Sequence, residues 1–325
     1  MNKVYFFVLS LLKRVLNKAD LTIKRSTEIS LVGIQHVNAC RLLQGLDNQE
    51  IKVNTTIGVV FSKDRPMQLY ALLKSYAKNV ENPVPLVILY NASSNKYEEA
   101  YSEVSLLLRD LEYTFVRENK FKESLVDILD GINQEKIFFL VDDIVFTEKL
   151  DMEDFVCVDS HKEIASMRLG NNLSFAYTAN KMQPLPELEH NKNTHQSKKL
   201  KWKWSNGCYD WGYPLSVDGN LFITKEVRAM IKIAEFKAPN SLEKSMQWFN
   251  SGFLERYGVC YAKSKIINIP FNKVQSENCN IAGEVSSRKL LQLWEQGYEL
   301  DLEKYYGIIN ISAHQECPLY VVERV

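Results

Sequence analysis

The sequence lacks several motifs that mark common classes of protein. Its six cysteines are scattered singly, with no CxxC pair and no cysteine–histidine cluster at zinc spacing, which excludes the common zinc folds and predicts reduced thiols in a cytosolic protein. No G-x-G-x-x-G motif follows the first predicted strand, which argues against a Rossmann oxidoreductase. Forty basic residues balance forty acidic ones, so no overall charge favours binding to nucleic acid.

Long apolar runs are also missing, and the run at the N-terminus is short. Val4–Leu12 cannot span a bilayer as a helix, which needs about 20 residues. The basic residues Lys13, Arg14 and Lys18 follow it. Residues 1–54 are therefore predicted to form a leader or helical extension, with a peripheral contact to an anionic membrane at the inner face of the plasma membrane. A signal peptide and an ordinary packing helix are the alternatives.

No repeat and no Gly/Ser-rich or Pro-rich linker divides the rest of the chain, which alternates strand and helix patterns from Thr55 on. Apolar β-rich runs predict strands over residues 56–61, 86–90, 113–116 and 136–141. Helical spacing predicts helices over residues 69–77, 97–108 and 121–129. This alternation predicts an α/β fold with a Rossmann-like, mostly parallel sheet flanked by helices, and ligands at the carboxyl ends of its strands.

The second half of the chain is less regular. Its patterns predict strands over residues 164–169 and near 259 and 266, and helices over 225–234 and 242–257. The lysine-rich stretch from His190 to Lys203 predicts a mobile loop over the site, a contact with a phosphate-bearing ligand, or simply a solvated face.

Polar residues follow three of the predicted strands. Asp142 and Asp143 come directly after the run KIFFLV, where carboxylates can hold a divalent metal and accept a hydrogen bond from a ribose. Ser62 and Arg65 follow the first strand, and Asn91 follows the second. A guanidinium at this edge can meet a base or a phosphate. Each residue also has an ordinary interpretation as part of a solvated turn.

The stretch KWKWSNGCYDWGYPLSVDGNLF is unusually rich in aromatic residues. The rings of Trp204 and Trp211 can pack against the C–H faces of a sugar, and Asp210 can bind hydroxyl groups, so all three are candidate substrate-binding residues. Tryptophan in the core is the alternative for each ring taken alone.

The order of these features resembles the GT-A glycosyltransferases over residues 55–145. The resemblance rests on two segments. VFSKDRPMQLYALLKSY is similar to the family's first strand and nucleotide-facing loop, and the acidic pair Asp142-Asp143 closes the fourth strand. The resemblance implies a GT-A fold with a nucleotide-binding half at 55–150 and an acceptor-binding half at 151–325. Only two carboxylates occupy the family's Asp-x-Asp position, so Asp142 is expected to face the ribose and Asp143 the metal, with Mn²⁺ or Mg²⁺ optional.

The resemblance continues more weakly into the acceptor half. Asp218-Gly219 resembles the segment that leads into it, and FKAPNSLEKSMQWF resembles the position where inverting members carry an acidic residue. Glu243 is therefore the first candidate for the base that takes the acceptor proton, and Asp218 the second. Ordinary helix capping is the alternative for Glu243.

One further segment, INIPFNKVQ, supplies polar residues after a predicted strand. Asn272 and Gln275 are candidate substrate-binding residues, and Lys273 could neutralise a diphosphate in the absence of a metal.

Together these features predict an enzyme that transfers a sugar from a nucleotide-sugar donor to a saccharide or lipid-linked acceptor. The family resemblance implies bacterial surface polysaccharide synthesis. A non-catalytic carbohydrate-binding module and a sugar nucleotidyltransferase are the alternatives. The loop FSKDRP lacks the glycines with which a nucleotidyltransferase usually opens.

Overall fold

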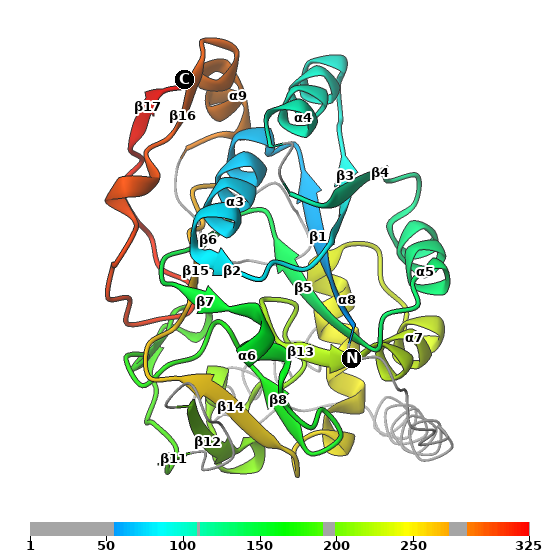
Figure 1. Ribbon diagram of the computed structural model, residues 1–325, viewed down its shortest axis with the longest axis vertical. Helices are drawn as coiled ribbons and strands as arrows, with labels where there is room; N and C mark the ends of the chain where they lie inside the picture. Colours follow the sequence, from blue (N-terminus) through cyan, green and yellow to red (C-terminus); the bar gives the residue numbers. More distant parts are fainter. Residues whose placement is uncertain (1–54, 109–110, 191–198, 273–284, 325) are drawn as a thin grey trace, which may run out of the picture.

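The computed structural model describes residues 55–108, 111–190, 199–272 and 285–324 (Figure 1). The predicted N-terminal leader, residues 1–54, lies outside the described residues. None of the helices within the described ranges has the length and apolar character needed to cross a bilayer.

A five-stranded, mostly parallel sheet forms the centre of the molecule, in the order β13-β5-β1-β3-β4 (Figure 1). Its parallel strands are β1 (Thr56–Lys63), β3 (Leu86–Asn91), β4 (Tyr113–Arg117) and β5 (Lys136–Val141). The antiparallel edge strand is β13 (Leu221–Ile223), which the sequence analysis missed. The predicted α/β fold with a mostly parallel sheet is confirmed.

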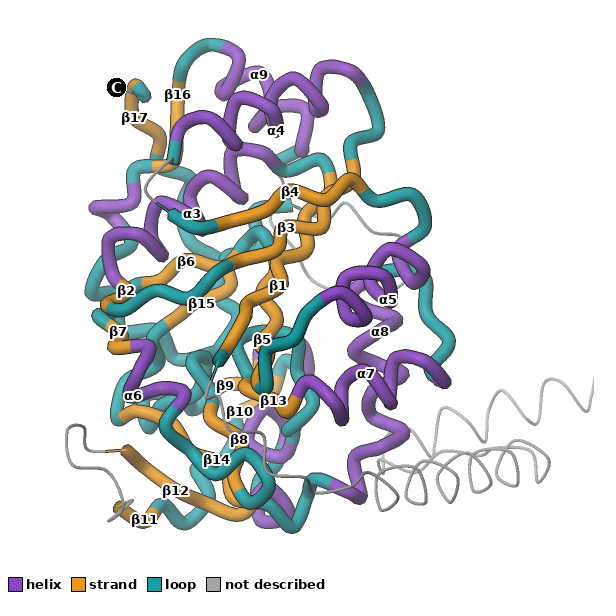
Figure 2. Tube along the Cα trace, turned by 45° about the vertical axis from the view of Figure 1, so that its right-hand side comes forward, coloured by secondary structure: helices purple, strands orange, loops and turns teal. Residues whose placement is uncertain are grey.

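Helices cover both faces of this sheet (Figure 2). The helices of the first half are α3 (Pro66–Asn79), α4 (Asn95–Leu107) and α5 (Phe121–Gly131). Those of the second half are α7 (Thr224–Ile233) and α8 (Pro239–Met246). Side chains of β1 alternate between the two layers, because Val60 packs with α3 and α4 while Val59 and Phe61 pack on the α5 side. A strand buried on both faces explains the unbroken apolar run.

A smaller sheet in the second half has the order β11-β12-β14-β8. Its strands are β11 (Glu189–His190), β12 (Lys199–Lys203), β14 (Tyr257–Tyr261) and β8 (Glu163–Ala165). The described end of the lysine-rich stretch is therefore a strand and not a loop over the site. Lys199 is buried against Asp154 at 3.0 Å, and Lys201 pairs with Glu163, so these lysines are neutralised within the protein.

Two further predictions for the second half need correction. The predicted strand over 164–169 is shorter, because β8 ends at Ala165. The helix predicted over 242–257 instead begins at Pro239, which suits the first helical position, and ends at Met246 before a 3₁₀ segment, η4 (Gln247–Gly252).

The C-terminal residues add a layer against α3 and α4 that the sequence analysis missed (Figure 1). It consists of α9 (Ser287–Glu295), β16 (Tyr298–Leu300) and β17 (Val321–Glu323). The guanidinium of Arg324 lies 3.6 Å from the ring centroid of Trp294, which fastens the end of the chain to α9.

Short elements complete the fold. The strands are β2 (Val80–Glu81), β6 (Ile144–Phe146), β7 (Leu150–Asp151), β9 (Phe175–Ala176), β10 (Lys181–Met182) and β15 (Ile266–Asn268). The helices are α6 (Met152–Val156), η1 (Tyr177–Ala179), η2 (Trp204–Asn206), η3 (Tyr209–Gly212) and η5 (Leu302–Lys304).

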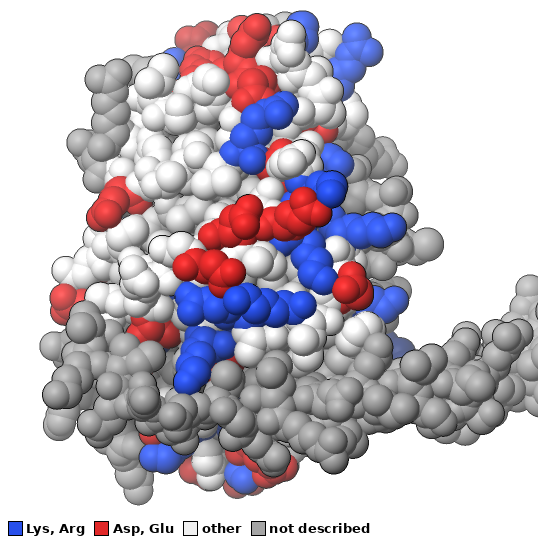
Figure 3. All heavy atoms as spheres, turned by 90° about the vertical axis from the view of Figure 1, so that its right-hand side faces the viewer, with Lys and Arg blue, Asp and Glu red and all other residues white. Residues whose placement is uncertain are grey.

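Charges of both signs are interspersed on the face shown in Figure 3. Ion pairs between α5 and the segment of α7 and its C-terminal end include Lys122–Glu235 and Lys232–Asp130, each at 3.0 Å. The four cysteines within the described residues, Cys157, Cys208, Cys260 and Cys317, are free.

Candidate active site

Six side chains from distant parts of the chain meet at the carboxyl end of β1 and β5, and we call them the strand-end cluster. They are Ser62, Arg65, Asp142, Asp143, Asn268 and Asn272. The buried guanidinium of Arg65 is at the centre. Its Nη1 lies 2.9 Å from Asp142 Oδ1 and 2.9 Å from Asp143 Oδ2. Its Nε and Nη2 donate to the side chain and the carbonyl oxygen of Asn272.

The backbone brings these groups together because β1 and β5 are parallel neighbours that end at the same level. Phe61 pairs with Val141, and the Asp142 amide donates to the Phe61 carbonyl at 3.1 Å. Asp64 then turns the chain with a positive φ of 53°, a conformation that aspartate tolerates, so that Arg65 turns back over the end of β5.

All four carboxylate oxygens of the acidic pair accept hydrogen bonds. Asp142 Oδ2 accepts from Ser62 Oγ at 2.8 Å and from the Lys63 amide at 3.1 Å. Asp143 Oδ1 accepts from Asn268 Nδ2 at 2.8 Å, and the remaining two oxygens face Arg65. Burial raises the pKa of Asp142 to about 6, although Arg65 opposes this shift and Asp143 adds to it.

This arrangement does not fit a divalent metal ion at Asp143. An ion would have to displace Arg65 or Asn268 from oxygens that they already occupy. Within the described residues, no group of three or more His, Cys, Asp or Glu side chains could hold a metal. In this arrangement the cation beside the acidic pair is Arg65, so the predicted role of Asp143 as a metal ligand, which stays a prediction, would require Arg65 or Asn268 to move. The predicted contact of Arg65 with a base or a phosphate also stays a prediction, because four of its N–H donors face Asp142, Asp143 and Asn272 in this arrangement.

Asn91 lies near this edge, at the end of β3, where it pairs in register with Lys63. Its carbonyl oxygen accepts from the Asp64 amide at 3.1 Å. The exposed Lys63 and the half-buried Glu118 complete the group, and burial raises the pKa of Glu118 even though Lys63 opposes the shift. The sequence analysis missed Lys63 and Glu118, whose only signal was their position at strand ends.

A second group of ionisable side chains, the carboxylate cluster, consists of Arg168, Asp210, Tyr213, Asp218, Glu243 and His314. Arg168 Nη2 lies 3.1 Å from Asp210 Oδ1, and His314 Nε2 lies 3.2 Å from Asp218 Oδ2. Glu243 Oε1 accepts from Ser216 Oγ at 2.8 Å and from the Val217 amide at 3.0 Å. The two candidate bases predicted from the sequence thus lie in one cluster.

The cluster separates the pKa values of its two candidate bases. Burial and the charge of Asp218 raise the pKa of Glu243. Burial also acts to raise the pKa of Asp218, but the hydrogen bond and charge of His314 outweigh it and lower that pKa. Two carboxylates with pKa values driven apart are suited to different tasks in acid–base chemistry.

The two clusters are joined through Asn268. Its side chain donates to Asp143, and its backbone forms a parallel bridge with His314, which in turn contacts Asp218. Asp218 itself comes to the end of β5 because the Gly219 amide donates to the Phe139 carbonyl at 2.7 Å. The sequence analysis missed Arg168, Asn268 and His314, since their partners are far away in the sequence.

The structure corrects the prediction that tryptophan rings face a sugar. Trp204 and Trp211 are both 0% exposed, and each packs edge-on against Trp202. Trp202 Nε1 donates to the Trp211 carbonyl at 3.0 Å, so the three rings form part of the core. Asp210 pairs with Arg168, and Asn272 Oδ1 accepts from Arg65 while its buried Nδ2 has no hydrogen-bond partner among the described residues, so their predicted contact with a substrate stays a prediction. Lys273 and Gln275 lie outside the described residues.

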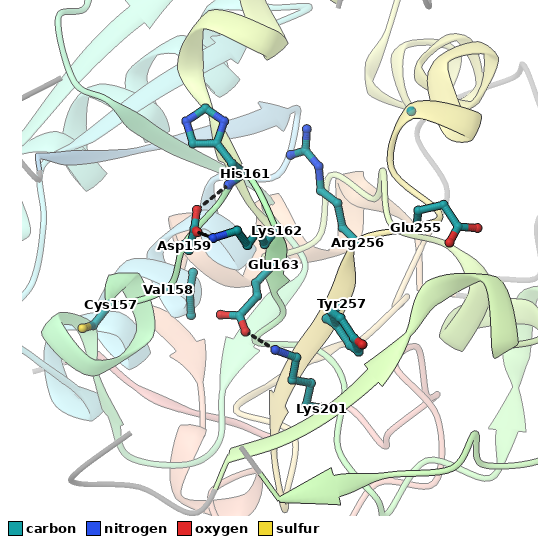
Figure 4. Close-up of a pocket in the computed structure, with 11 residues that line it drawn as sticks. Cys157, Val158, Asp159, His161, Lys162, Glu163, Lys201, Glu255, Arg256 and Tyr257 are labelled. Carbon is teal, nitrogen blue, oxygen red and sulfur yellow. Dashed lines mark hydrogen bonds and ion pairs between the residues drawn. The ribbon is translucent and has the colours of Figure 1, made fainter. Parts of the chain in front are cut away.

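A pocket of about 660 Å³ lies away from both clusters (Figure 4). It is lined by residues of 157–163 and 252–257 together with Lys201, close to the amino end of β5, where Lys136 Nζ donates to the Val158 carbonyl at 3.0 Å. Its cations are paired, Lys162 with Asp159 at 2.9 Å and Lys201 with Glu163. Ligands of parallel α/β sheets bind at the opposite ends of the strands, so the two clusters, and not this pocket, are the candidate active site.

No family model matches the chain, and no curated protein matches it. Among solved structures, it is similar to TarS of S. aureus, with 13% identity over 65% of this chain and 36% of that one, at a TM-score of 0.41. It is similar to the mannosyltransferase PcManGT from Pyrobaculum calidifontis, in complex with GDP-Man and Mn²⁺, with 13% identity over 45% of each chain and a TM-score of 0.30. A nucleotidyl transferase, Mth528 from Methanothermobacter, has 10% identity over 65% of this chain and 89% of that one, at a TM-score of 0.31. The chain thus spans less than two thirds of the first two proteins, and we base the functional proposal on its own side chains.

Replacing Arg65 tests the electrostatic role of the strand-end cluster. Arg65→Ala leaves two buried carboxylates without their counter-ion, so we expect the free energy of unfolding to fall by about 3–5 kcal/mol in urea denaturation. Mg²⁺ should restore part of this loss and leave the wild-type protein unchanged. Arg117→Ala removes an exposed ion pair with Glu98 and is the control. An Arg65 effect as small as that of the control would contradict the role assigned here.

The ion pair of His314 and Asp218 predicts a pH dependence of stability. Burial would lower the pKa of His314, but Asp218 raises it above its ordinary 6.5, and His314 holds the pKa of Asp218 below its ordinary 3.8. The histidine contribution is complete below pH 6.5 and is lost as the pH rises through the raised value. The aspartate contribution is present above pH 3.8 and is lost as the pH falls through the lowered value.

We therefore expect His314→Gln to be less stable than wild type by about 1 kcal/mol near pH 5.5, with the difference disappearing as the pH rises through the raised pKa of His314. Urea denaturation at a series of pH values measures it. His161→Gln, at an exposed histidine, is the control. A difference that grows with pH would show that the pair is not charged as described.

Proposed function

We propose that this protein is a glycosyltransferase that moves a sugar from a nucleotide-sugar donor to a saccharide or lipid-linked acceptor. The observation that carries the proposal is a series of contacts from Arg65 to Glu243. Arg65 contacts Asp143, which accepts from Asn268; the backbone of Asn268 bridges His314, which pairs with Asp218, and the charge of Asp218 acts on Glu243. This series places a pair of carboxylates with separated pKa values beside the strand ends, where parallel α/β sheets bind nucleotides.

The donor nucleotide, in this proposal, lies over the nucleotide-binding half, residues 55–150, against Lys63, Asn91 and Glu118. Lys63 is exposed and is free to approach a diphosphate, whereas Arg65 is held by the acidic pair. We retain Lys273 as a second candidate for neutralising the diphosphate. Asp142 accepts from the Lys63 amide, and both Asp142 and Asp143 accept from Arg65, so the acidic pair holds this edge in place.

Glu243 is the proposed general base. Its raised pKa makes it a stronger proton acceptor than Asp218, whose carboxylate is stabilised by His314. As the acceptor oxygen attacks the anomeric carbon, its proton passes to Glu243. The bond from that carbon to the nucleotide diphosphate breaks, and the diphosphate leaves with the electron pair. Asp218 keeps its negative charge and, with His314, fixes the geometry beside Glu243.

The acceptor then occupies the half formed by residues 151–325. A saccharide or glycolipid acceptor, and a place in bacterial surface polysaccharide synthesis, follow from the family resemblance of the first half. The same holds for a peripheral contact of residues 1–54 with the inner face of the plasma membrane. A non-catalytic carbohydrate-binding module would have no need for carboxylates with separated pKa values.

Glu243→Gln separates catalysis from binding. Gln keeps the shape and can still accept from Ser216 and Val217, so we expect the nucleotide-dependent thermal shift to persist while donor hydrolysis and transfer fall by about 10²–10⁴-fold. Glu235→Gln, at an exposed glutamate, is the control. A carbohydrate-binding module would show no turnover to lose, and undiminished turnover in the variant would exclude Glu243 as the base.

Donor binding is tested by thermal shift with UDP, GDP, CMP and TDP. A nucleotide present at about 100 times its Kd should stabilise the protein by roughly 2.7 kcal/mol. We expect the same stabilisation with Mn²⁺ and with EDTA, because Arg65 occupies the carboxylate oxygens that would bind a metal. No stabilisation by any of the four nucleotides would refute the proposed function, and a shift that requires Mn²⁺ would refute its independence of metal.

A further inference from the structure

Three consecutive backbone amides hold the sharp turn between the end of β1 and the start of α3. The amides of Lys63 and Asp64 donate to groups at the ends of the neighbouring strands β5 and β3, each at 3.1 Å. The third amide, that of Arg65, donates instead to the hydroxyl oxygen of Tyr101 at 3.0 Å. Tyr101 lies in the middle of α4, so a helix side chain completes the set of hydrogen bonds that fixes this turn.

The hydroxyl group of Tyr101 forms a second hydrogen bond, and its neighbours determine the direction of that bond. Tyr101 Oη lies 2.6 Å from Ser62 Oγ, which itself donates to Asp142 Oδ2 at 2.8 Å. A serine has one hydroxyl proton and an ionised carboxylate can only accept, so Tyr101 is the donor to Ser62. Burial raises the pKa of Tyr101 well above its ordinary range, so the hydroxyl keeps this proton. It therefore donates to one end of the turn and accepts from the other.

Tyr101 acts from a rigid and buried position. Its side chain is only 1% exposed, and its ring packs against that of Tyr90 with the centroids 4.8 Å apart. The C-terminal layer holds α4 in turn, because α9 lies beside it and Trp294 Nε1 donates to Glu103 Oε2 at 2.7 Å (Figure 1). The hydroxyl group thus contacts the turn and not a ligand, and any part it has in binding acts through the turn.

We propose that Tyr101 is the positioning residue of the donor edge: its hydroxyl group holds the turn from Ser62 to Arg65 so that Lys63 faces the diphosphate of the nucleotide sugar. This inference rests on the proposed function for the identity of the ligand. The diphosphate carries negative charge already in the bound donor, so a misplaced Lys63 weakens donor binding more than it slows the transfer. The effect is therefore expected in KM for the donor and not in kcat.

Two tyrosine variants separate positioning from ordinary structural support. Tyr101→Phe removes the hydroxyl group and keeps the ring in the core. Tyr76→Phe is the matched control, because Tyr76 is 0% exposed and its hydroxyl group donates to the Val84 carbonyl at 3.0 Å and accepts from the Val84 amide at 2.9 Å. Val84 precedes β3, at the opposite end of that strand from the turn. Each variant loses two buried hydrogen bonds, so we expect Tm to fall in both.

Amide hydrogen exchange, measured by NMR on the free protein, tests whether the hydroxyl group holds the turn. In Tyr101→Phe the Arg65 amide loses its acceptor, so its exchange should accelerate by about tenfold or more. In Tyr76→Phe it should stay within about threefold of wild type. An Arg65 amide that exchanges at the wild-type rate in Tyr101→Phe would overturn the proposal, whether or not the protein binds a nucleotide.

Titration with UDP, GDP and TDP tests the consequence for the donor. For a nucleotide that binds the wild type, Kd and the donor KM should rise by about tenfold in Tyr101→Phe, with kcat within about threefold. Both constants should stay within about threefold in Tyr76→Phe. Equal losses in the two variants would make Tyr101 a purely structural residue and would also overturn the proposal.

The wild type gives a second test if Tyr101→Phe does not fold. Nucleotide should shift the NMR signal of the Tyr101 hydroxyl proton and leave that of Tyr76 in place, and an unshifted Tyr101 signal would count against the positioning role. No binding of any nucleotide, together with Arg65 exchange that depends on Tyr101, would leave the held turn and remove the transferase. Nucleotide binding that both variants retain would keep the transferase and remove the role of Tyr101.

Discussion

The buried guanidinium of Arg65 is the constraint on which the site depends. Two adjacent carboxylates at the end of a buried strand repel each other strongly, because little water is present to screen their charges. Arg65 stabilises them there by contacting both. The same side chain reaches Asn272, so one residue ties β1, β5 and the segment after β15 together. The edge is therefore preorganised: its charges are compensated within the protein.

The charges at the strand ends already compensate one another within the protein, and this determines where we place the proposed proton transfer. The Asp142 oxygens both accept hydrogen bonds and Arg65 contacts two carboxylates, so these groups are held in place, whereas Glu243 has a raised pKa and the buried Nε of Arg168 has no hydrogen-bond partner among the described residues. The proposed mechanism therefore assigns proton transfer to the carboxylate cluster. Asn268 keeps that cluster at a fixed place relative to the strand ends, because it contacts Asp143 with its side chain and bridges His314 with its backbone.

The sequence predicted the first half of the fold closely because each strand and helix there is determined by residues that are close together in the sequence. The run KIFFLV is β5 at its predicted bounds, and the helix after Arg65 begins at a proline suited to that position. The second half depends on long-range pairing that periodicity does not report. Strand β13 is three residues long, and β12 is a strand only because β14 pairs with it and Glu163 and Asp154 neutralise its lysines.

In the site, too, the sequence predicted the residues whose positions depend on near neighbours and missed those whose partners are far away in the sequence. Carboxylates at strand ends and near a helix start were found from the sequence, since those positions are set by neighbouring residues. Arg168 and His314 were not found, because nothing near them in the sequence indicates that Asp210 and Asp218 are their partners. The aromatic stretch was recognised by composition, but composition does not tell which ring is buried. Trp202, Trp204 and Trp211 are buried in the core, whereas Tyr209, the aromatic residue between Trp204 and Trp211, remains exposed and has a positive φ.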